Sequence, residues 1–260
     1  MKPPPRIHLS RFLSIPLATI AYALSAAVVG ISAFPSAVIA WWGARTLLPH
    51  PSLGRLALFC LLAGGAVYLF LFCGLLVTGL LMRILSPAVR PGTHRVVSAA
   101  GAFWMGMNGV QALAIRLFLP LVPGGYFSTL YLRLAGCRIG RDAWIIGATI
   151  LEPHLVSIGD GTIVGGEAVI SAHIAGGRDV TFAPIHIGRD CRIGAHSVIC
   201  AGVTVGDGAT VGMHAFLRRG TRVQPGTIVA AIGGLPPREA LAMEGKARRA
   251  RPGTGDRVSS

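Results

Sequence analysis

The sequence predicts a chain of two parts, an N-terminal transmembrane helical hairpin followed by a parallel β-helix. The first part rests on two long apolar stretches, residues 12–44 and 56–82, which contain no charged residue. The second rests on an aliphatic residue that recurs at every sixth position from Ile187 onward. Composition agrees, because 52% of the residues are hydrophobic and only 13% are charged, against ~25% charged residues in soluble domains. An ordinary soluble globular protein and a disordered chain are both excluded.

The two apolar stretches are expected to cross the membrane as helices over about residues 14–42 and 56–82, within a membrane anchor of residues 1–95. A helix crosses the hydrocarbon core with roughly 20 residues, so each stretch is long enough. The first is too long for the apolar region of a cleaved signal peptide, which has roughly 7–15 residues. Basic residues are more numerous at the two outer ends than in the connecting loop, which favours a cytoplasmic location for both ends. They are Lys2, Arg6 and Arg11 before the hairpin and Arg83, Arg90 and Arg95 after it, against Arg45 and Arg55 in the loop.

Residues 96–136 are expected to form an interfacial helix and a connector. Residues 96–115 carry no charge, but polar side chains and glycines make them less apolar than the two stretches before them. A helix of this kind, flanked by Arg95 and Arg116, is typical of a segment that lies in the headgroup region of a bilayer. A third transmembrane helix is the alternative, and it would place the rest of the chain on the other side of the membrane.

The hexapeptide repeat extends over residues 137–232 and predicts about five coils of a parallel β-helix. Each repeat forms a short strand and a turn, and three repeats complete one triangular coil. The aliphatic residue fills the axis, a small residue two positions earlier fits the corner, and glycine relaxes the turn. The predicted axial residues are Ile139, Ile145, Leu151, Ile158, Val164, Ile170, Ile187, Ile193, Ile199, Val205, Val211, Leu217, Val223 and Val229.

The repeat is interrupted once, between Ile170 and Ile187, where 17 residues separate two axial positions instead of six. A loop over about residues 172–184 is therefore expected to protrude from the β-helix, and such insertions commonly carry function in repeat proteins. After the last repeat, residues 233–260 are expected to form a C-terminal extension with a short helix and a partly disordered basic tail. No aromatic side chains accompany that tail for base stacking, so nucleic-acid binding is not expected.

Several stretches resemble known bacterial proteins. IGRDCRIGAHSVICAGVTVGDGATVG is similar to the hexapeptide-repeat acyltransferases, which fold as a left-handed parallel β-helix. RPGTHRVVS, YLRLAGCRIGRDAW, HLVSIGDG and PIHIG resemble the membrane-embedded C-terminal domains of ε-poly-lysine-synthetase-type nonribosomal peptide synthetases. The resemblance implies a homotrimer with active sites between neighbouring β-helices, and acyl-CoA or a carrier-bound acyl-pantetheine as donor, without a metal. With the charge pattern, it predicts a multi-pass protein of the bacterial cytoplasmic (inner) membrane whose catalytic domain faces the cytoplasm.

Acyl transfer to an amine or hydroxyl requires a general base with a pKa near neutrality, and histidine is suited to this role. His173 is the first candidate, because it stands where the chain enters the loop and the resembled family carries a catalytic histidine in such a loop. His154 is the second candidate. Glu167 is favoured as the carboxylate that orients the base, because it lies in the same coil. The alternative carboxylates are Glu152, Asp160 and Asp179.

Four histidines follow an axial position by three residues, which places them outward, near a turn. His196 and His214 are 18 residues apart, so they are expected to stack on one edge of the β-helix. His154 and His173 are 19 residues apart across a one-residue slip and are expected to stack in the same way.

Substrate and donor contacts are expected from the loop and from the last coils. His186 stands at the far foot of the loop, where it is expected to close over the substrate, and Asp179 lies within the loop. Arginine side chains bind phosphate, so a cluster in the last coils is a candidate docking site for CoA or for a carrier protein. A solvated basic face is the other interpretation of this cluster. It consists of Arg218, Arg219 and Arg222.

The expected function is that of a membrane-anchored acyltransferase that moves an acyl or aminoacyl group from a thioester to an amine or hydroxyl. The alternative is a non-catalytic scaffold or assembly protein tethered to the membrane. A γ-type carbonic anhydrase shares the β-helix but requires zinc-ligating histidines with a His-x4-His spacing. Arg178 follows His173 and Ala201 follows His196 at that spacing, which excludes the carbonic anhydrase.

Overall fold

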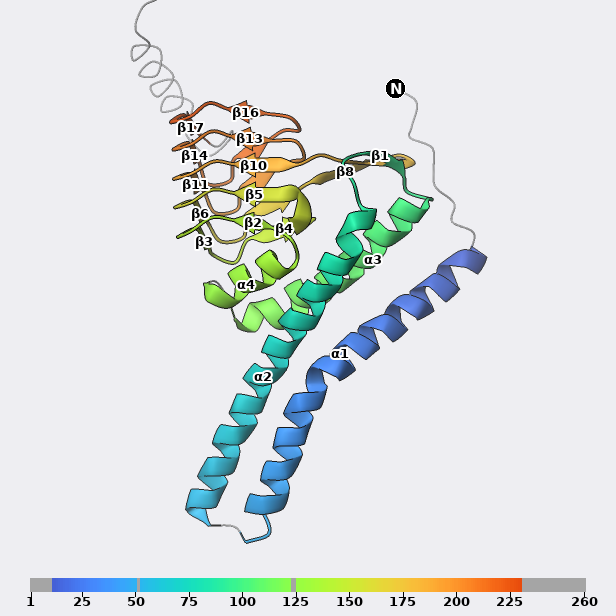
Figure 1. Ribbon diagram of the computed structural model, residues 1–260, viewed down its shortest axis with the longest axis vertical. Helices are drawn as coiled ribbons and strands as arrows, with labels where there is room; N and C mark the ends of the chain where they lie inside the picture. Colours follow the sequence, from blue (N-terminus) through green and yellow to red (C-terminus); the bar gives the residue numbers. More distant parts are fainter. Residues whose placement is uncertain (1–10, 51, 123–124, 231–260) are drawn as a thin grey trace, which may run out of the picture.

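The computed structural model describes residues 11–50, 52–122 and 125–230. It consists of long helices followed by a parallel β-helix of about five coils (Figure 1). The predicted fold class, helices apolar enough to span a membrane followed by a parallel β-helix, is confirmed. The expected C-terminal helix and tail, residues 233–260, lie outside the described residues.

Two long antiparallel helices, α1 (Arg11–Leu47) and α2 (Leu53–Leu85), form the hairpin. Both extend beyond the spans expected from the sequence. Ser52 caps α2, since its hydroxyl accepts a hydrogen bond from the backbone N–H of Arg55 at 3.3 Å. The stretches Tyr22–Leu47 and Leu53–Ala88 are long and apolar enough to cross a membrane. A short 3-10 turn, η1 (Ser86–Ala88), follows α2.

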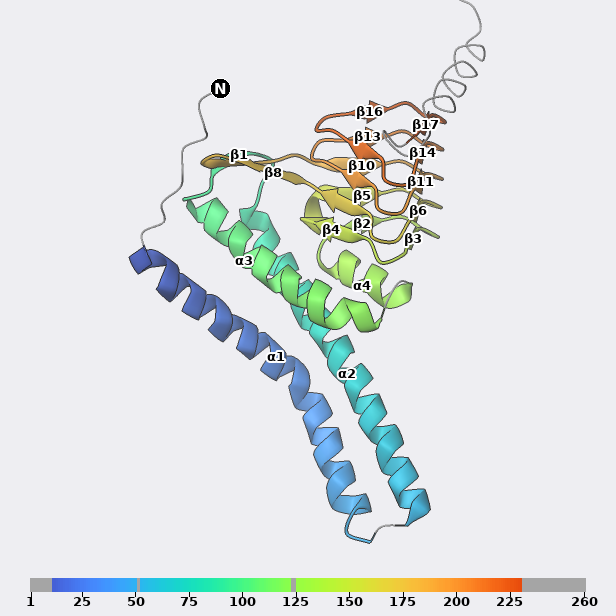
Figure 2. The same cartoon turned by 180° about the vertical axis from the view of Figure 1, so that it is seen from behind.

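Helix α3 (Ala99–Leu113) continues through a π-helical turn, η2 (Ala114–Phe118), and a 3-10 turn, η3 (Leu119–Leu121). By length and composition, Ala99–Leu121 is a third stretch that could cross a membrane, so the interfacial placement of this segment stays a prediction. It packs closely on α2, because a Cβ atom at Gly74 would approach the Phe118 ring to 2.3 Å. Helix α4 (Tyr126–Leu134) follows, and α3 and α4 lie beneath the first coil of the β-helix (Figures 1 and 2).

The β-helix has three faces, each a parallel sheet whose strands come from successive coils. The first face contains β2 (Arg138–Ile139), β5 (Val156–Ile158), β10 (Ile185–Ile187), β13 (Thr204–Val205) and β16 (Arg222–Val223). The second face contains β3 (Trp144–Ile145), β6 (Ile163–Val164), β11 (Arg192–Ile193), β14 (Thr210–Val211) and β17 (Ile228–Val229). The third face contains β4 (Thr149–Leu151), β7 (Val169–Ser171), β12 (Val198–Ile199) and β15 (Phe216–Leu217).

The axial residues of the repeat form the core as predicted: Ile187, Ile193 and Ile199 are at most 3% exposed. The first coil differs at one position, where Ile150 rather than Leu151 is buried and pairs with Ile170. The turn between β3 and β4 is one residue shorter than the equivalent turns of later coils. Gly147 there takes the left-handed conformation, with φ at 63°. The axial spacing is therefore five residues from Ile145 to Ile150 and eight residues from Ile150 to Ile158, where the sequence pattern predicts six and seven.

The interruption of the repeat is an ordered β-hairpin of β8 (His173–Gly176) and β9 (Asp179–Phe182). Strand β1 (Gly92–Arg95), which follows the hairpin of long helices, pairs antiparallel with β9 and pairs Arg95 with Asp179. The three strands form a small sheet beside the β-helix, above one end of α3 (Figure 2). The predicted loop is thus tied to the segment between α2 and α3.

Candidate functional site

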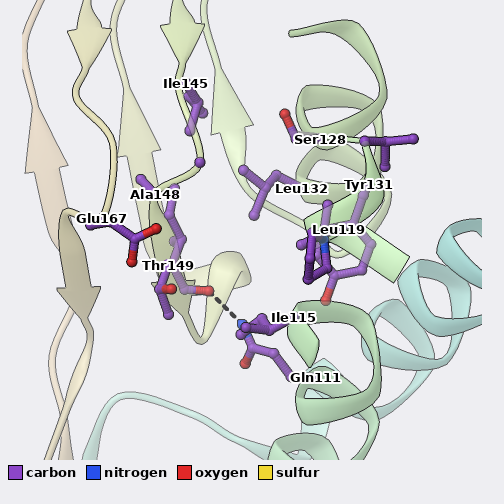
Figure 3. Close-up of a pocket in the computed structure, with 14 residues that line it drawn as sticks. Gln111, Ile115, Leu119, Ser128, Tyr131, Leu132, Ile145, Ala148, Thr149 and Glu167 are labelled. Carbon is purple, nitrogen blue, oxygen red and sulfur yellow. Dashed lines mark hydrogen bonds between the residues drawn. The ribbon is translucent and has the colours of Figure 1, made fainter. Parts of the chain in front are cut away.

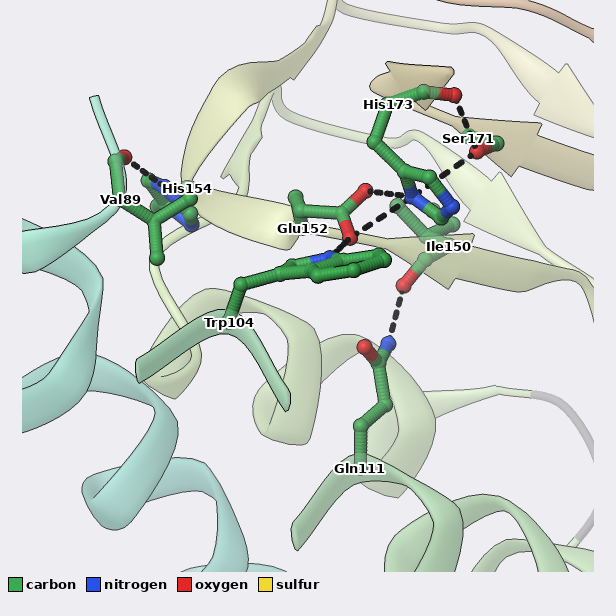
Figure 4. A network of polar contacts seen from close by, with 8 residues as sticks. All are labelled: Val89, Trp104, Gln111, Ile150, Glu152, His154, Ser171 and His173. Carbon is green, nitrogen blue, oxygen red and sulfur yellow. Dashed lines mark hydrogen bonds and ion pairs between the residues drawn. The ribbon is translucent and has the colours of Figure 1, made fainter. Parts of the chain in front are cut away.

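The main polar cluster lies where the third face of the β-helix turns toward the first, at the start of the β8–β9 hairpin (Figure 4). His173 Nδ1 lies 2.9 Å from both carboxylate oxygens of Glu152. Glu152 directly follows β4, adopts a left-handed φ of 50°, and is followed by the 3-10 turn η4 (Pro153–Leu155). Its side chain is 2% exposed, whereas the His173 side chain keeps 20% of its surface exposed. A buried carboxylate therefore holds a partly accessible imidazole.

Trp104 on α3 completes this cluster from the helical part of the molecule. Its indole Nε1 donates a hydrogen bond to Glu152 Oε1 at 2.9 Å. Its ring meets the His173 ring edge-on, with the centroids 5.0 Å apart, and also contacts Phe182 at 5.9 Å. Trp104 was not singled out from the sequence. The signal that points to it is its spacing of seven residues from Gln111, which places both on one face of an apolar helix.

Gln111 attaches the same helix to the strand that precedes Glu152. Its side-chain Nε2 donates a hydrogen bond to the backbone oxygen of Ile150, and the side chain is buried. Strand β4 is the outermost strand of the third face, so α3 covers a strand edge that would otherwise expose unpaired backbone groups. Two contacts two turns apart on α3 thus fix the position of Glu152.

The hydrogen bonds define which nitrogen of His173 is basic. A carboxylate only accepts hydrogen bonds, so the proton of the neutral imidazole lies on Nδ1 and the lone pair on Nε2. Ser171 supports this arrangement, because its hydroxyl donates to the His173 backbone oxygen at 3.1 Å. Nε2 has no hydrogen-bond partner among the described residues. The cluster can therefore accept a proton at Nε2 while Glu152 stabilises the imidazolium that results.

His154, the second candidate base, occupies a different environment. Its Nε2 lies 2.9 Å from the backbone oxygen of Val89, in the segment after α2. The expected stacking of His154 on His173 is wrong, because η4 directs the two side chains toward different partners (Figure 4). Burial lowers the pKa of His154, and its Nδ1 is buried with no partner in the described structure. His154 therefore links the β-helix to the segment that follows α2, and it does not face the β8–β9 hairpin.

Glu167, favoured from the sequence as the orienting carboxylate, lies on the edge between the second and third faces, whereas His173 lies on the next edge. It takes a left-handed φ of 57°, as do His196 at 56° and His214 at 57° on the same edge. The rings of His196 and His214 stack with centroids 5.0 Å apart and planes 3° apart, which confirms that prediction. The structure therefore pairs Glu152, not Glu167, with His173.

The other residues expected at the site are spread over the molecule. Asp179 is exposed at the start of β9. His186 is exposed on the first face, where its Nδ1 lies 2.7 Å from the hydroxyl of Ser157. Three arginines of the last coils are exposed, and they come from coils well above the one that holds Glu152. They are Arg218, Arg219 and Arg222. None of these groups has a recorded contact with His173 in the described structure.

A cavity of about 370 Å³ lies between the lower end of the β-helix and the helices α3 and α4 (Figure 3). Aliphatic side chains form most of its wall, and Glu167 lies at its side. The wall includes Gln111, Ile115, Leu119, Ser128, Tyr131, Ile145, Ala148 and Ile150. In the described part of the chain, no group of three or more His, Cys, Asp or Glu side chains could hold a metal ion.

A family model described as the hexapeptide repeat of succinyl-transferase matches residues 184–218, which span β10 to β15. The match supports the resemblance to hexapeptide-repeat acyltransferases. The link to the ε-poly-lysine-synthetase-type domains stays a prediction. A search of curated proteins found no match.

Solved structures with a similar fold include a hexapeptide-repeat-containing acetyltransferase from Vibrio cholerae, 26% identical, with a TM-score of 0.35. The similarity covers 37% of this chain and 58% of that one, so the chain spans little more than half its length. Galactoside acetyltransferase in complex with coenzyme A is 15% identical over 61% of this chain and 93% of its own, with a TM-score of 0.42. The N-acyltransferase AntD from Bacillus cereus, in complex with dTDP and 3-hydroxybutyryl-CoA, is 15% identical over 49% of this chain and 97% of its own, with a TM-score of 0.29.

Proposed function

We propose that this protein is an acyltransferase that moves an acyl or aminoacyl group from a thioester to an amine or hydroxyl. The observation that carries the proposal is the buried Glu152 carboxylate 2.9 Å from His173 Nδ1, beside the hairpin that interrupts the hexapeptide repeat. A histidine oriented by a carboxylate is the arrangement that a general base for acyl transfer requires. The match of the repeat to a succinyl-transferase model supports the same chemistry.

The reaction follows from the position of the free nitrogen. His173 Nε2 takes the proton of the acceptor amine or hydroxyl as the acceptor atom attacks the thioester carbonyl carbon. A C–N or C–O bond forms, the C–S bond breaks, and the imidazolium returns its proton to the departing thiolate. Glu152 stabilises the imidazolium between these steps, since a hydrogen bond to a charged group is stronger than one between neutral groups.

Trp104 acts in this proposal as a positioning residue, because it touches Glu152 and the edge of the His173 ring. Two hydrogen-bond donors, Trp104 Nε1 and His173 Nδ1, occupy the carboxylate and fix its plane. The base is thereby held against a helix of the stretch Ala99–Leu121. We propose on this ground that catalysis takes place next to the membrane surface.

We further propose that the helices anchor the protein in the bacterial inner membrane with the β-helix in the cytoplasm. The excess of basic residues outside the helical hairpin supports this orientation. A homotrimer and a donor site are part of the same proposal. The homotrimer follows from the resemblance of the repeat, and the donor site from the capacity of arginine side chains to bind phosphate; its residues are Arg218, Arg219 and Arg222. The donor is acyl-CoA or a carrier-bound acyl-pantetheine.

The test is release of free thiol from acetyl-CoA by the purified full-length protein in lipid nanodiscs, with amine and alcohol acceptors supplied separately. We expect acceptor-dependent release that is lost in His173→Ala. His214→Ala is the matched control, since it removes an exposed imidazole from another edge. Equal release by wild type and His173→Ala would overturn the assignment of the base. No release with any acyl-CoA or carrier-bound donor would favour the scaffold alternative.

A further inference from the structure

The cavity between the β-helix and the helices has the composition of a site for an aliphatic chain. Its volume of about 370 Å³ falls within the roughly 300–1,000 Å³ of ligand pockets. Ile115 and Leu119 line one side, and Ile145 and Ile150 line the other. Apolar walls of this kind gain free energy when a hydrocarbon replaces water.

The cavity adjoins a segment that suits a membrane environment. Ile115 and Leu119 belong to Ala99–Leu121, which is long and apolar enough to cross a membrane. On the same stretch Leu117 and Leu121 are 38% and 60% exposed, so apolar surface continues outside the cavity. Exposed apolar side chains therefore lie next to the cavity on the same helical stretch, together with the exposed Arg116.

Among the polar groups that line the cavity, one has no hydrogen-bond partner in the described structure. Tyr131 is 1% exposed and lines the cavity, yet its hydroxyl forms no hydrogen bond in the described structure. A buried hydroxyl without a partner carries an energetic cost that a ligand oxygen or a water molecule can offset. Of the other polar residues that line the cavity, Gln111 and Ser128 donate to backbone oxygens, and Thr149 and Glu167 complete the set. The unpartnered hydroxyl therefore belongs to a residue of the cavity wall, where a bound ligand could satisfy it.

The cavity also has a fixed relation to the proposed base. Gln111 lines the cavity and binds the backbone of Ile150, while Trp104 on the same helix face binds Glu152, two residues further along. The cavity and the Glu152–His173 pair thus lie along one contact between α3 and the strand β4.

We propose that this cavity, which we name the chain pocket, binds the aliphatic chain of an amphiphilic substrate of the acyl transfer. That the ligand is a substrate rests on the proposed function, whereas binding of an aliphatic chain in the pocket can be tested without measuring activity. Two sources share this chemistry: the acyl group of a long-chain thioester donor and the hydrocarbon tail of a lipid-like acceptor.

The test is photolabelling of the full-length protein in phosphatidylcholine nanodiscs with a hexadecanoic acid that carries a diazirine group. We expect labelled peptides from residues 115–119 and 145–150, and at least fivefold less label there when unlabelled hexadecanoic acid is in excess. Label on the lipid-facing surface of α1 serves as the internal reference, because bilayer lipid already covers it.

Ala148→Phe fills the pocket from the β-helix side and is expected to reduce the competed label at least fivefold. Ile228→Phe introduces the same ring at a residue that is 66% exposed in the last coil and leaves the label unchanged. Unfolding midpoints verify that both variants fold. If Ala148→Phe does not fold, Leu119→Trp fills the pocket from the opposite wall. The proposal is overturned if excess unlabelled hexadecanoic acid does not reduce the label at the pocket. It is also overturned if the label persists in a folded variant whose pocket is filled by Ala148→Phe or Leu119→Trp.

Two competitors distinguish the sources of the chain. Protection by hexadecanoyl-CoA assigns the pocket to the donor, and protection by hexadecylamine assigns it to the acceptor tail. Protection by neither overturns the proposal that the chain belongs to a substrate. The labelling is independent of thiol release, so a failure of the proposed acyl transfer and a failure of the chain pocket are recorded by different experiments.

Discussion

Replacing Glu152 by glutamine tests the central contact of the site with little change in volume. The amide oxygen can still accept the hydrogen bond from Trp104 Nε1, so the packing around the indole is retained. The charge opposite His173 Nδ1 is lost. An amide nitrogen facing Nδ1 also donates a hydrogen bond to it, which moves the imidazole proton to Nε2 and blocks the basic lone pair.

The magnitude follows from the 2.9 Å separation of His173 Nδ1 and the carboxylate oxygens. Opposite charges ~4 Å apart attract by about 4 kcal/mol at an effective dielectric constant of ~20. A hydrogen bond to a charged group contributes about 1.5–3 kcal/mol. A loss of roughly 2–4 kcal/mol in the transition state slows the reaction about 30- to 1,000-fold, since about 1.4 kcal/mol corresponds to a factor of ten.

The assay is kcat for thiol release from acetyl-CoA with a saturating acceptor, together with the unfolding midpoint of each variant. Glu167→Gln is the informative comparison, since Glu167 lies on another edge; we expect Glu152→Gln to lose at least tenfold more kcat. Asp142→Asn, an exposed carboxylate at a corner of the first coil, controls for loss of a negative charge. A folded Glu152→Gln protein within about threefold of the wild-type kcat would refute the assigned role of Glu152.

Three further predictions concern stability and reactivity. Burial lowers the pKa of His154 below its value in the unfolded chain, so the folded state binds this proton less readily. Stability is therefore lost as pH falls below about 6.5, the ordinary pKa of histidine. The drop in thermal unfolding midpoint from pH 7.5 to 5.5 should be smaller in His154→Gln than in the wild type. Burial raises the pKa of Cys137 to about 12, so iodoacetamide at pH 8 should leave it unmodified until the protein is unfolded, as read by mass spectrometry. Ile199→Ala should cost about 2–5 kcal/mol in urea unfolding because Ile199 is 0% exposed, whereas Ile228→Ala, at 66% exposed, should cost less than about 1 kcal/mol.

The β-helix could be predicted because its period is unusual and sustained. A six-residue recurrence fits neither a helix nor a simple alternating strand, and the same residues that carry it, such as Ile193 and Val205, fill the axis. One axial position of the first coil was misplaced by one residue, because Ile150 and Leu151 are both aliphatic and adjacent. Only the shortened turn at Gly147 decides between them, and a turn length is fixed by three-dimensional closure of the coil.

The candidate site could be predicted only in part. His173 was accessible from the sequence because it begins the interruption of the repeat, whereas its partner depends on which edge of the β-helix each carboxylate occupies. Glu152 was one of several alternatives, and its left-handed φ of 50°, which turns it toward His173, has no signature in the residue pattern. Trp104 lies 48 residues before Glu152 and on another type of element. The spacing of Trp104 and Gln111 places both on one face of a helix, but it does not reveal which carboxylate that face contacts.

These contacts join the helical part and the β-helix at the candidate site. The lowest strands of the first and third faces, β2 and β4, begin their sheets, and α4 and α3 lie beneath them. Without α3, Glu152 would lose the Trp104 donor, and the Ile150 backbone oxygen would lose Gln111. The carboxylate that orients the proposed base is therefore held from one side by the β-helix and from the other by a helix apolar enough for the membrane. A displacement of α3 must therefore also displace the support of His173.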